Sequence, residues 1–169
     1  RAYDCSEEER RSLDVTWRML EDFTTDENAL VAADGSGSMY WGSKPMPAAV
    51  AQSLAIYFAE HNKGKFHNHF LTFSMTPQLA EIKGEDFVEK VRYCRTFDEC
   101  ANTNLEAVFD LILQAAAENH VPRAEMPAKL YIISDMEFDH CVKNSSMTNF
   151  ENAKASYAAA GYILPDLVF

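Results

Sequence analysis

Apolar residues along this chain follow two spacings, one typical of buried strands and one typical of helices. An uninterrupted apolar run at 29–33 is followed by Asp34, and a second short apolar run at 130–134 is followed by Asp135. Both runs predict strands that are covered on both faces. Looser patterns predict further strands at 66–73 and 163–169, and a short antiparallel edge strand at 78–82. The chain therefore has the strands for one mixed sheet.

Helical spacing predicts five helices between and before these strands, at 6–23, 48–61, 86–93, 103–119 and 149–160. The first begins with Ser6 and Glu9 as a capping box. Leu13, Trp17 and Leu20 recur at helical spacing in it, and the buried stripe of the second helix is predicted to be Val50, Leu54 and Phe58. Strands that alternate with helices favour an α/β fold, a three-layer sandwich around a mostly parallel sheet with one antiparallel edge strand.

Composition narrows the classes of protein to consider. The 169 residues are 47% hydrophobic and 24% charged, which is typical of one soluble globular domain. No stretch approaches the roughly 20 apolar residues of a membrane helix, so we expect no membrane insertion. A net charge of −11 disfavours direct nucleic-acid binding by this domain. Four widely spaced cysteines without a CxxC pair favour reduced thiols in a cytoplasmic, intracellular protein.

Two segments are predicted: an N-terminal helical segment, residues 1–25, that links to a preceding region, and one α/β domain, residues 26–169. No helix is evident after the final predicted strand. We therefore expect this chain to be a domain of a longer protein.

Oxygen-bearing side chains gather where two predicted strands end. Asp34, Ser36 and Ser38 alternate along a glycine-rich turn after the first strand, and glycines let such a turn fold tightly. Asp135 ends the strand at 130–134, and Thr103 begins the most regular helix. Ligands of open α/β sheets bind beyond the carboxyl ends of the strands, so these five residues are expected to meet there.

A divalent cation would satisfy this set of five groups. Two bare carboxylates close together repel each other, and a cation removes that repulsion. All five groups are hard oxygen donors, which favour Mg²⁺, Mn²⁺ or Ca²⁺ over zinc, with Mg²⁺ the best match to short hydroxyl arms and an octahedral shell.

The motif Asp34-x-Ser36-x-Ser38, with Thr103 and Asp135 in order behind it, resembles the metal-ion-dependent adhesion site (MIDAS) of von Willebrand factor type A (vWA) domains. The similarity covers about 28–169. The stretches 104–113 and 134–139 further resemble a little-characterised intracellular family of these domains, near the TROVE (Ro autoantigen) proteins. The resemblance implies a Rossmann-like vWA fold.

The resemblance also implies roles for the five residues. The serines would bind the metal directly, Asp34 and Asp135 would bind it directly or through water, and Thr103 would join or leave the metal's shell. In adhesion members of the family, a carboxylate of the partner completes that shell. The resemblance therefore implies that this protein binds an acidic group on a partner protein in a metal-dependent way, and that it is not an enzyme.

The sequence departs from the family pattern near the motif, and one of the five residues also has a simpler interpretation. Ala33 and Gly35 are smaller than the family's aliphatic residues, and the aromatics Tyr40 and Trp41 lie beside the motif as a partner-contact rim. Thr103 and Glu106 also form a capping box.

The remaining candidates each have a simple structural interpretation. The motif at 34–38 could be an ordinary turn, since Asp, Ser and Gly are common turn residues. His67 and His69 could share a strand face as a metal pair, although partly exposed histidines without a metal are the favoured interpretation. Glu137 and Asp139 could lie near the metal or in a solvated loop.

Two other functions remain open at this point. One is a Mg²⁺-dependent hydrolase or phosphoryl-transfer enzyme that uses the same ligands. The other is a structural module of a ribonucleoprotein. The sequence lacks the phosphate-binding and dinucleotide motifs and the GxSxG nucleophile elbow, which disfavours the enzyme. The partner's identity and the oligomeric state are left open.

Overall fold

The computed structural model describes residues 5–24, 28–42, 44–74, 76–97, 105–135 and 142–169. Its centre is a five-stranded sheet with strand order β3-β2-β1-β4-β5. Three of the four strand pairings are parallel, and the β2–β3 pairing is antiparallel. The strands are β1 (Ala29–Asp34), β2 (His69–Phe73), β3 (Leu79–Glu81), β4 (Lys129–Ile133) and β5 (Asp166–Val168). The predicted fold class, a mostly parallel sheet with one antiparallel edge strand, is confirmed.

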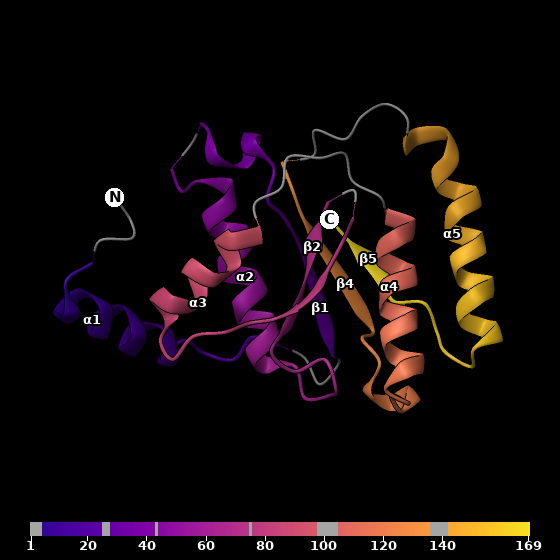
Figure 1. Ribbon diagram of the computed structural model, residues 1–169, viewed down its shortest axis with the longest axis horizontal. Helices are drawn as coiled ribbons and strands as arrows, with labels where there is room; N and C mark the ends of the chain where they lie inside the picture. The colour runs from indigo at the N-terminus through magenta and orange to yellow at the C-terminus, as the bar shows by residue number, and fades with distance from the viewer. Residues whose placement is uncertain (1–4, 25–27, 43, 75, 98–104, 136–141) are drawn as a thin grey trace.

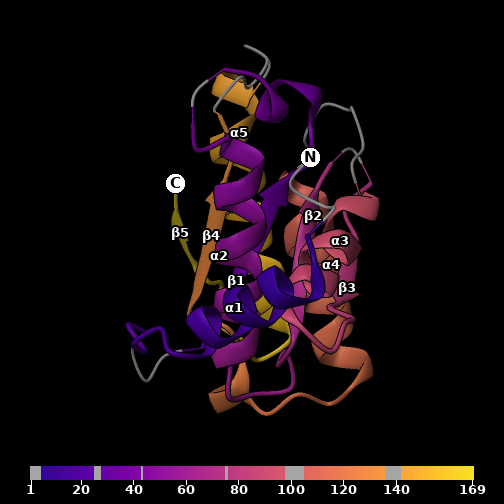
Figure 2. The ribbon, with the colours of Figure 1, turned by 90° about the vertical axis from the view of Figure 1, so that its left-hand side faces the viewer.

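Helices cover both faces of the sheet, as Figure 1 shows edge-on and Figure 2 from the side. On one side lie α1 (Glu7–Arg18), α2 (Pro47–His61) and α3 (Phe87–Cys94), and on the other lie α4 (Leu105–Glu118) and α5 (Val142–Ala159). Short 3-10 helices are η1 (Gly37–Tyr40), η2 (Arg95–Phe97) and η3 (Arg123–Glu125). No described helix is long and apolar enough to cross a membrane.

Strand β1 is the centre of the fold because all six of its residues are buried. Its side chains alternate between the two layers, as expected for a strand. Leu30 and Ala32 pack with the α4 side of the core, whereas Val31 and Ala33 pack with the α2 side. An uninterrupted apolar run is what such a strand needs, which is why the sequence predicted it well.

The buried face of α2 differs from the prediction. Val50 is 38% exposed, and Leu54 and Phe58 are only half-buried. The buried face is instead made mostly of small residues: Ala48, Ala51, Gln52, Ala55, Ile56 and Ala59. Because alanine side chains are short, α2 can lie close against β1, and this tertiary packing overrides the preference for large apolar residues.

The bounds of four elements differ from the prediction by about three residues or more at one end. The first helix ends at Arg18, and of the apolar residues at helical spacing Leu13 and Leu20 are 43% and 46% exposed. Strand β2 begins three residues late, because Asn68 has a positive φ of 62° and belongs to a turn. Helix α5 begins seven residues early, at Val142, and β5 is only three residues long.

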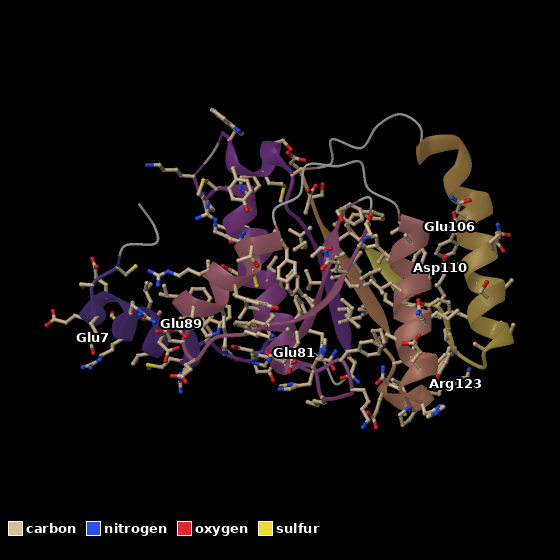
Figure 3. All side chains as sticks on the ribbon, viewed as in Figure 1. Glu7, Glu81, Glu89, Glu106, Asp110 and Arg123 are labelled. Atoms are coloured by element: carbon tan, nitrogen blue, oxygen red, sulfur yellow. The ribbon has the colours of Figure 1, made fainter. Side chains whose placement is uncertain are left out.

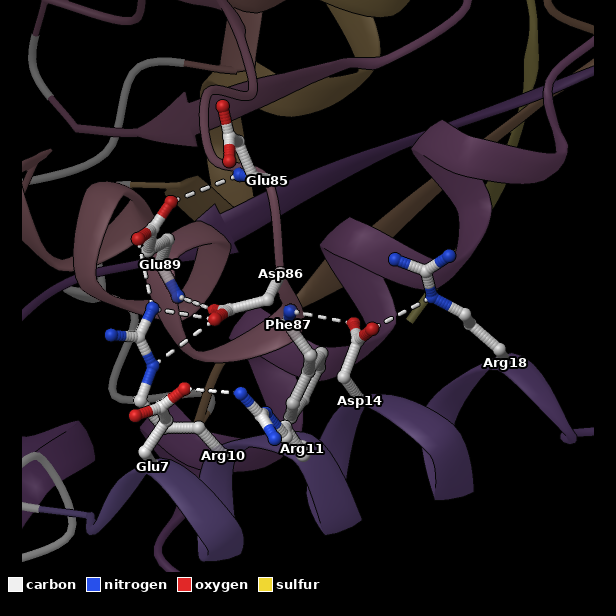
Figure 4. A network of polar contacts seen from close by, with 9 residues as sticks. All are labelled: Glu7, Arg10, Arg11, Asp14, Arg18, Glu85, Asp86, Phe87 and Glu89. Carbon is white, nitrogen blue, oxygen red and sulfur yellow. Dashed lines mark hydrogen bonds and ion pairs between the residues drawn. The ribbon is translucent and has the colours of Figure 1, made fainter.

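Helix α1 packs on α3 through one aromatic stack and through a network of charges, and Figure 4 draws the network. Its predicted capping box is confirmed, since the Ser6 hydroxyl accepts from Glu9 N–H and the Glu9 carboxylate accepts from Ser6 N–H. Trp17 stacks on Phe87 with 4.2 Å between ring centroids. The helix is thereby fixed to the domain through its one large half-buried apolar residue.

Arg10 is the centre of that charge network. Its Nε donates to Asp86 Oδ2 at 3.0 Å, and its Nη2 donates to Glu89 Oε1 at 2.8 Å. The N–H of Glu85 and the Arg10 guanidinium lower the pKa of Glu89. Burial raises the pKa of Asp86, but hydrogen bonds from the Glu89 N–H and Arg10 outweigh it, so that the net shift is also downward.

We expect this network to make stability depend on acid pH. Carboxylates whose pKa is lowered on folding stabilise the protein above their ordinary values of 3.8 and 4.5, and that contribution is lost as pH falls through the lower folded values. Urea unfolding between pH 6 and 3 should show a shallower pH dependence in Arg10→Met than in the wild type. An identical pH dependence would contradict the assigned role of Arg10.

Candidate functional site

The candidate site lies at the carboxyl ends of β1 and β4, which are neighbouring parallel strands. From β1 the chain continues to β2 and β3 on one side of β1, and then crosses to β4 on the other side. The strand order therefore reverses between β1 and β4. This reversal is the topological switch point where open α/β sheets bind ligands. Asp34 is the last residue of β1, and Asp135 follows β4 by two positions. The two strands therefore end side by side in the sheet.

Asp34 organises the turn after β1. Its carboxyl is nearly buried, and its Oδ1 accepts the backbone N–H of Ser36 at 2.8 Å. This contact is the two-residue aspartate turn that glycine-rich loops often contain. Ser36 then caps η1, whose first turn carries Ser38, and the two serine hydroxyls lie 3.1 Å apart. Three of the five predicted residues are therefore brought together by one short loop.

The spacing of the two hydroxyls is compatible with one small cation. Mg²⁺ binds six oxygens at about 2.1 Å in an octahedron, so adjacent ligands lie about 3 Å apart. The Ser36 and Ser38 hydroxyl oxygens have that separation. The nearby Asp34 carboxylate supplies negative charge, and hydroxyl and carboxylate oxygens are the donors that such ions prefer.

The end of β4 is joined to this loop by two contacts. The Ser134 hydroxyl donates to Asp34 Oδ2 at 2.6 Å. The backbone N–H of Asp135 donates to the thioether sulfur of Met39 at 3.2 Å, and Met39 is fully buried. Asp135 itself is half-buried. Its backbone is thus held beside the residues that follow β1.

Ser134 and Met39 were not among the residues predicted for this site. Ser134 had a usable signal, because it is a small polar residue between an apolar strand and a predicted ligand. Met39 had none, since no sequence pattern predicts that a buried thioether will accept a backbone N–H. Both residues connect β4 to the loop at 34–38.

Thr103 lies outside the described residues, as do Glu137 and Asp139. Their placement at the site stays a prediction. Within the described ranges, no group of three or more His, Cys, Asp or Glu side chains could hold a metal ion. The predicted ligand set has two carboxylates and otherwise hydroxyls, so it does not require such a group.

His67, His69 and the buried Cys94 do not add ligands to this site. His67 is exposed in the turn before β2, and its Nδ1 contacts the carbonyl oxygen of Asn62 at 2.7 Å. His69 Nδ1 contacts the carbonyl of His67 at the same distance. Burial raises the pKa of the Cys94 thiol to about 12, so it carries no thiolate at neutral pH.

The two aromatic residues beside the motif have different environments. Tyr40 is half-buried, and its hydroxyl accepts from the Nε2 of the buried Gln52 at 3.1 Å. The Arg95 guanidinium lies 5.7 Å from the Tyr40 ring centroid. Trp41 is 79% exposed. Of the predicted aromatic rim, Trp41 therefore presents the larger surface to solvent.

The acidic side chains of this protein are spread over several elements. The acids labelled in Figure 3 lie on α1, β3, α3 and α4, namely Glu7, Glu81, Glu89, Glu106 and Asp110. The net charge of −11 is therefore not concentrated at the carboxyl ends of β1 and β4 alone.

Comparisons with known proteins agree with this fold. The crystal structure of the Deinococcus radiodurans RO (RSR) protein is similar, with a TM-score of 0.55 and 14% identity over 90% of this chain. A protein of Acanthamoeba polyphaga mimivirus described as "Uncharacterized protein L728" is 33% identical over 155 residues, or 92% of this chain.

This chain spans only about a quarter of either protein, 28% of the first and 26% of the second. The match to the first shows a shared fold. A family model matches residues 28–169, from just before β1 to the end of β5. The chain belongs to the family described as "Domain of unknown function (DUF7788)".

Proposed function

We propose that this chain is a vWA-type domain that binds one divalent cation, preferably Mg²⁺, and uses it to dock an acidic group of a partner protein. One observation carries the proposal. Asp34, Ser36 and Ser38 converge on one loop at the switch point, beside the strand end that holds Asp135. That is the place and the donor chemistry that a metal-dependent adhesion site requires.

The residues have distinct roles in this proposal. Ser36 and Ser38 would hold the cation directly, with Asp34 and Asp135 binding it directly or through water, and Thr103 completing the set. The bound cation supplies a positive charge that attracts a carboxylate from the partner. Asp34 already accepts two hydrogen bonds, from Ser36 and Ser134, which keep its carboxylate in place for this role.

A titration tests the metal site, and a binding experiment tests the docking role. Calorimetry with MgCl₂ should show one saturable site per chain. A pulldown from cell extract in Mg²⁺ should recover partners that are absent in chelator, and replacing the partner's acidic residues by amides should abolish recovery. Equal recovery with and without chelator would contradict metal-dependent docking.

Catalysis is the main competing function for the same residues. A Mg²⁺-dependent phosphatase would be expected to turn over a generic phosphate ester, and Asp135→Asn should abolish that turnover. We propose binding instead, because the described loop has the hydroxyl of Ser36 where an aspartyl phosphatase would want a second acid. Turnover by the wild type that Asp135→Asn removes would favour the enzyme.

A structural module of a ribonucleoprotein is the second candidate. The similarity in fold to the Deinococcus radiodurans RO (RSR) protein favours it, together with the sequence resemblance to TROVE proteins. The net charge of −11 argues that RNA would contact another part of such a protein. Filter binding of RNA to this chain and to a longer form that contains it would separate the two cases.

A further inference from the structure

The ends of β1 and β4 hold each other through two contacts that run in opposite directions. Ser134, at the end of β4, donates its hydroxyl hydrogen to the carboxylate of Asp34 at the end of β1. Met39, in the turn after β1, accepts the backbone N–H of Asp135 after β4. Each strand end thus contributes one residue that fixes the acidic residue of the other, and we call these two contacts the reciprocal clasp.

We propose that Ser134 and Met39 are positioning residues that set the distance between Asp34 and Asp135 and thereby the metal affinity of the site. This inference rests on the proposed metal site. It extends that proposal by assigning a role to two residues that would not themselves bind the cation.

The Ser134 contact is the stronger half of the clasp. A hydroxyl that donates to a carboxylate makes a charge-assisted hydrogen bond, which is shorter and stronger than a neutral one, and the O–O distance of this bond is 2.6 Å. The bond holds Oδ2, while the Ser36 N–H holds Oδ1, so the carboxyl plane of Asp34 is fixed from both sides. Partners of this kind commonly set metal affinity by orienting the ligand.

The Met39 contact is weaker but is protected from water. A thioether is a poor acceptor, yet Met39 is fully buried and packs in the α2-side core. The Asp135 N–H therefore has a partner whose position is set by the packing of η1 against α2. Leucine has nearly the same volume but no acceptor, which makes Met39→Leu a suitable test.

Backbone pairing fixes Asp34 relative to β2, where it stands in register with Phe73, but it does not fix Asp34 relative to Asp135. The β1–β4 register runs from Ala29 with Lys129 to Ala33 with Ile133, and it stops before Asp34 and Asp135. Beyond Ala33 and Ile133, the two strand ends are in contact through the Ser134 hydroxyl and the Met39 sulfur. A binding site must be held within about 0.5 Å of its working geometry by the contacts that support it, and the clasp would supply such support here.

The experiment compares Mg²⁺ affinity in four variants. Ser134→Ala removes the donor, Ser134→Thr keeps a hydroxyl, and Met39→Leu removes the sulfur. Ser74→Ala is the matched control, because Ser74 is a buried serine at the carboxyl end of β2 whose hydroxyl has no partner within the described part of the chain. Circular dichroism of the metal-free variants shows whether each is folded at the temperature of the titration.

Calorimetry with MgCl₂ should find about tenfold weaker binding for Ser134→Ala and roughly threefold weaker binding for Met39→Leu. Ser134→Thr and Ser74→Ala should bind within about twofold of the wild type. A merely structural serine would lower the melting temperature of the metal-free protein without changing the affinity of the folded fraction.

The outcomes separate the two proposals. If the wild type binds Mg²⁺ and folded Ser134→Ala binds it equally well, the clasp is overturned and the metal site stands. If Ser134→Thr is as weak as Ser134→Ala, the hydroxyl is not the cause and the clasp is again overturned. If the wild type binds no Mg²⁺, the proposed function fails, and this inference fails with it.

Discussion

Asp34→Ala is expected to abolish Mg²⁺ binding, with an affinity loss on the order of a hundredfold or more, while the domain stays folded. The substitution removes a carboxylate that stabilises the cation and also the acceptor for Ser36 N–H and the Ser134 hydroxyl. Leaving a buried donor unpaired costs about 1–3 kcal/mol. Ser36 and Ser134 are only half-buried, so that water can replace the carboxylate as acceptor and reduce the cost for each. A domain of this size has a free energy of unfolding of roughly 5–15 kcal/mol, so it should tolerate that loss.

Calorimetry measures the affinity, and circular dichroism confirms the fold. Asp166→Ala is the matched control, since Asp166 is an exposed aspartate at the start of β5, in register with Lys129 at the opposite end of the sheet. The control removes the same charge from the protein and should leave Mg²⁺ affinity unchanged. Equal binding by Asp34→Ala and the wild type would show that the ion, if any, binds elsewhere.

Ala55→Leu is expected to lower the free energy of unfolding by about 3 kcal/mol, the upper part of the range for overpacking a core. Ala55 is 1% exposed on the face of α2 that packs against the sheet, and Ala51 and Ala59 flank it one turn away on either side. Three further carbon atoms at this position have no space unless the helix moves away from β1. Urea denaturation gives the free energy directly.

Val50→Ala serves as the comparison on the same helix. Val50 is 38% exposed, so its truncation should cost well under 1 kcal/mol. The sequence pattern alone would have predicted the opposite order, with the larger loss at Val50. A larger loss for Val50→Ala than for Ala55→Leu would mean that α2 packs with its other face toward the sheet.

The sheet could be predicted from sequence because its signal is local. The run at 29–33 has no polar position and the run at 130–134 has one only at its end, Ser134, and such runs are typical of a strand covered on both faces. The buried face of α2 could not be predicted, because which side of the helix faces the sheet depends on how closely the helix approaches β1. Size preference favoured Leu54 and Phe58, whereas close packing selected alanines.

In the candidate site too, the residues that are close in sequence could be predicted, and those that depend on tertiary contacts could not. Asp34, Ser36 and Ser38 are close in sequence, so a tight turn necessarily brings them together, and Asp135 followed from the end of a predicted strand. Ser134 and Met39 reach the site across the β1–β4 boundary, and their roles depend on a tertiary contact. The role of Thr103 stays a prediction, because that residue lies outside the described ranges.

Paramagnetic broadening by Mn²⁺ would locate the cation most directly. In a titration of uniformly ¹⁵N-labelled protein with substoichiometric Mn²⁺, the amide signals of residues 34–39 and 134–135 should broaden first, and excess Mg²⁺ should restore them. Signals at the other end of the sheet, such as that of Asp166, should keep their intensity. Broadening that begins elsewhere, or that spreads evenly over the acidic surface, would contradict a cation site at the ends of β1 and β4.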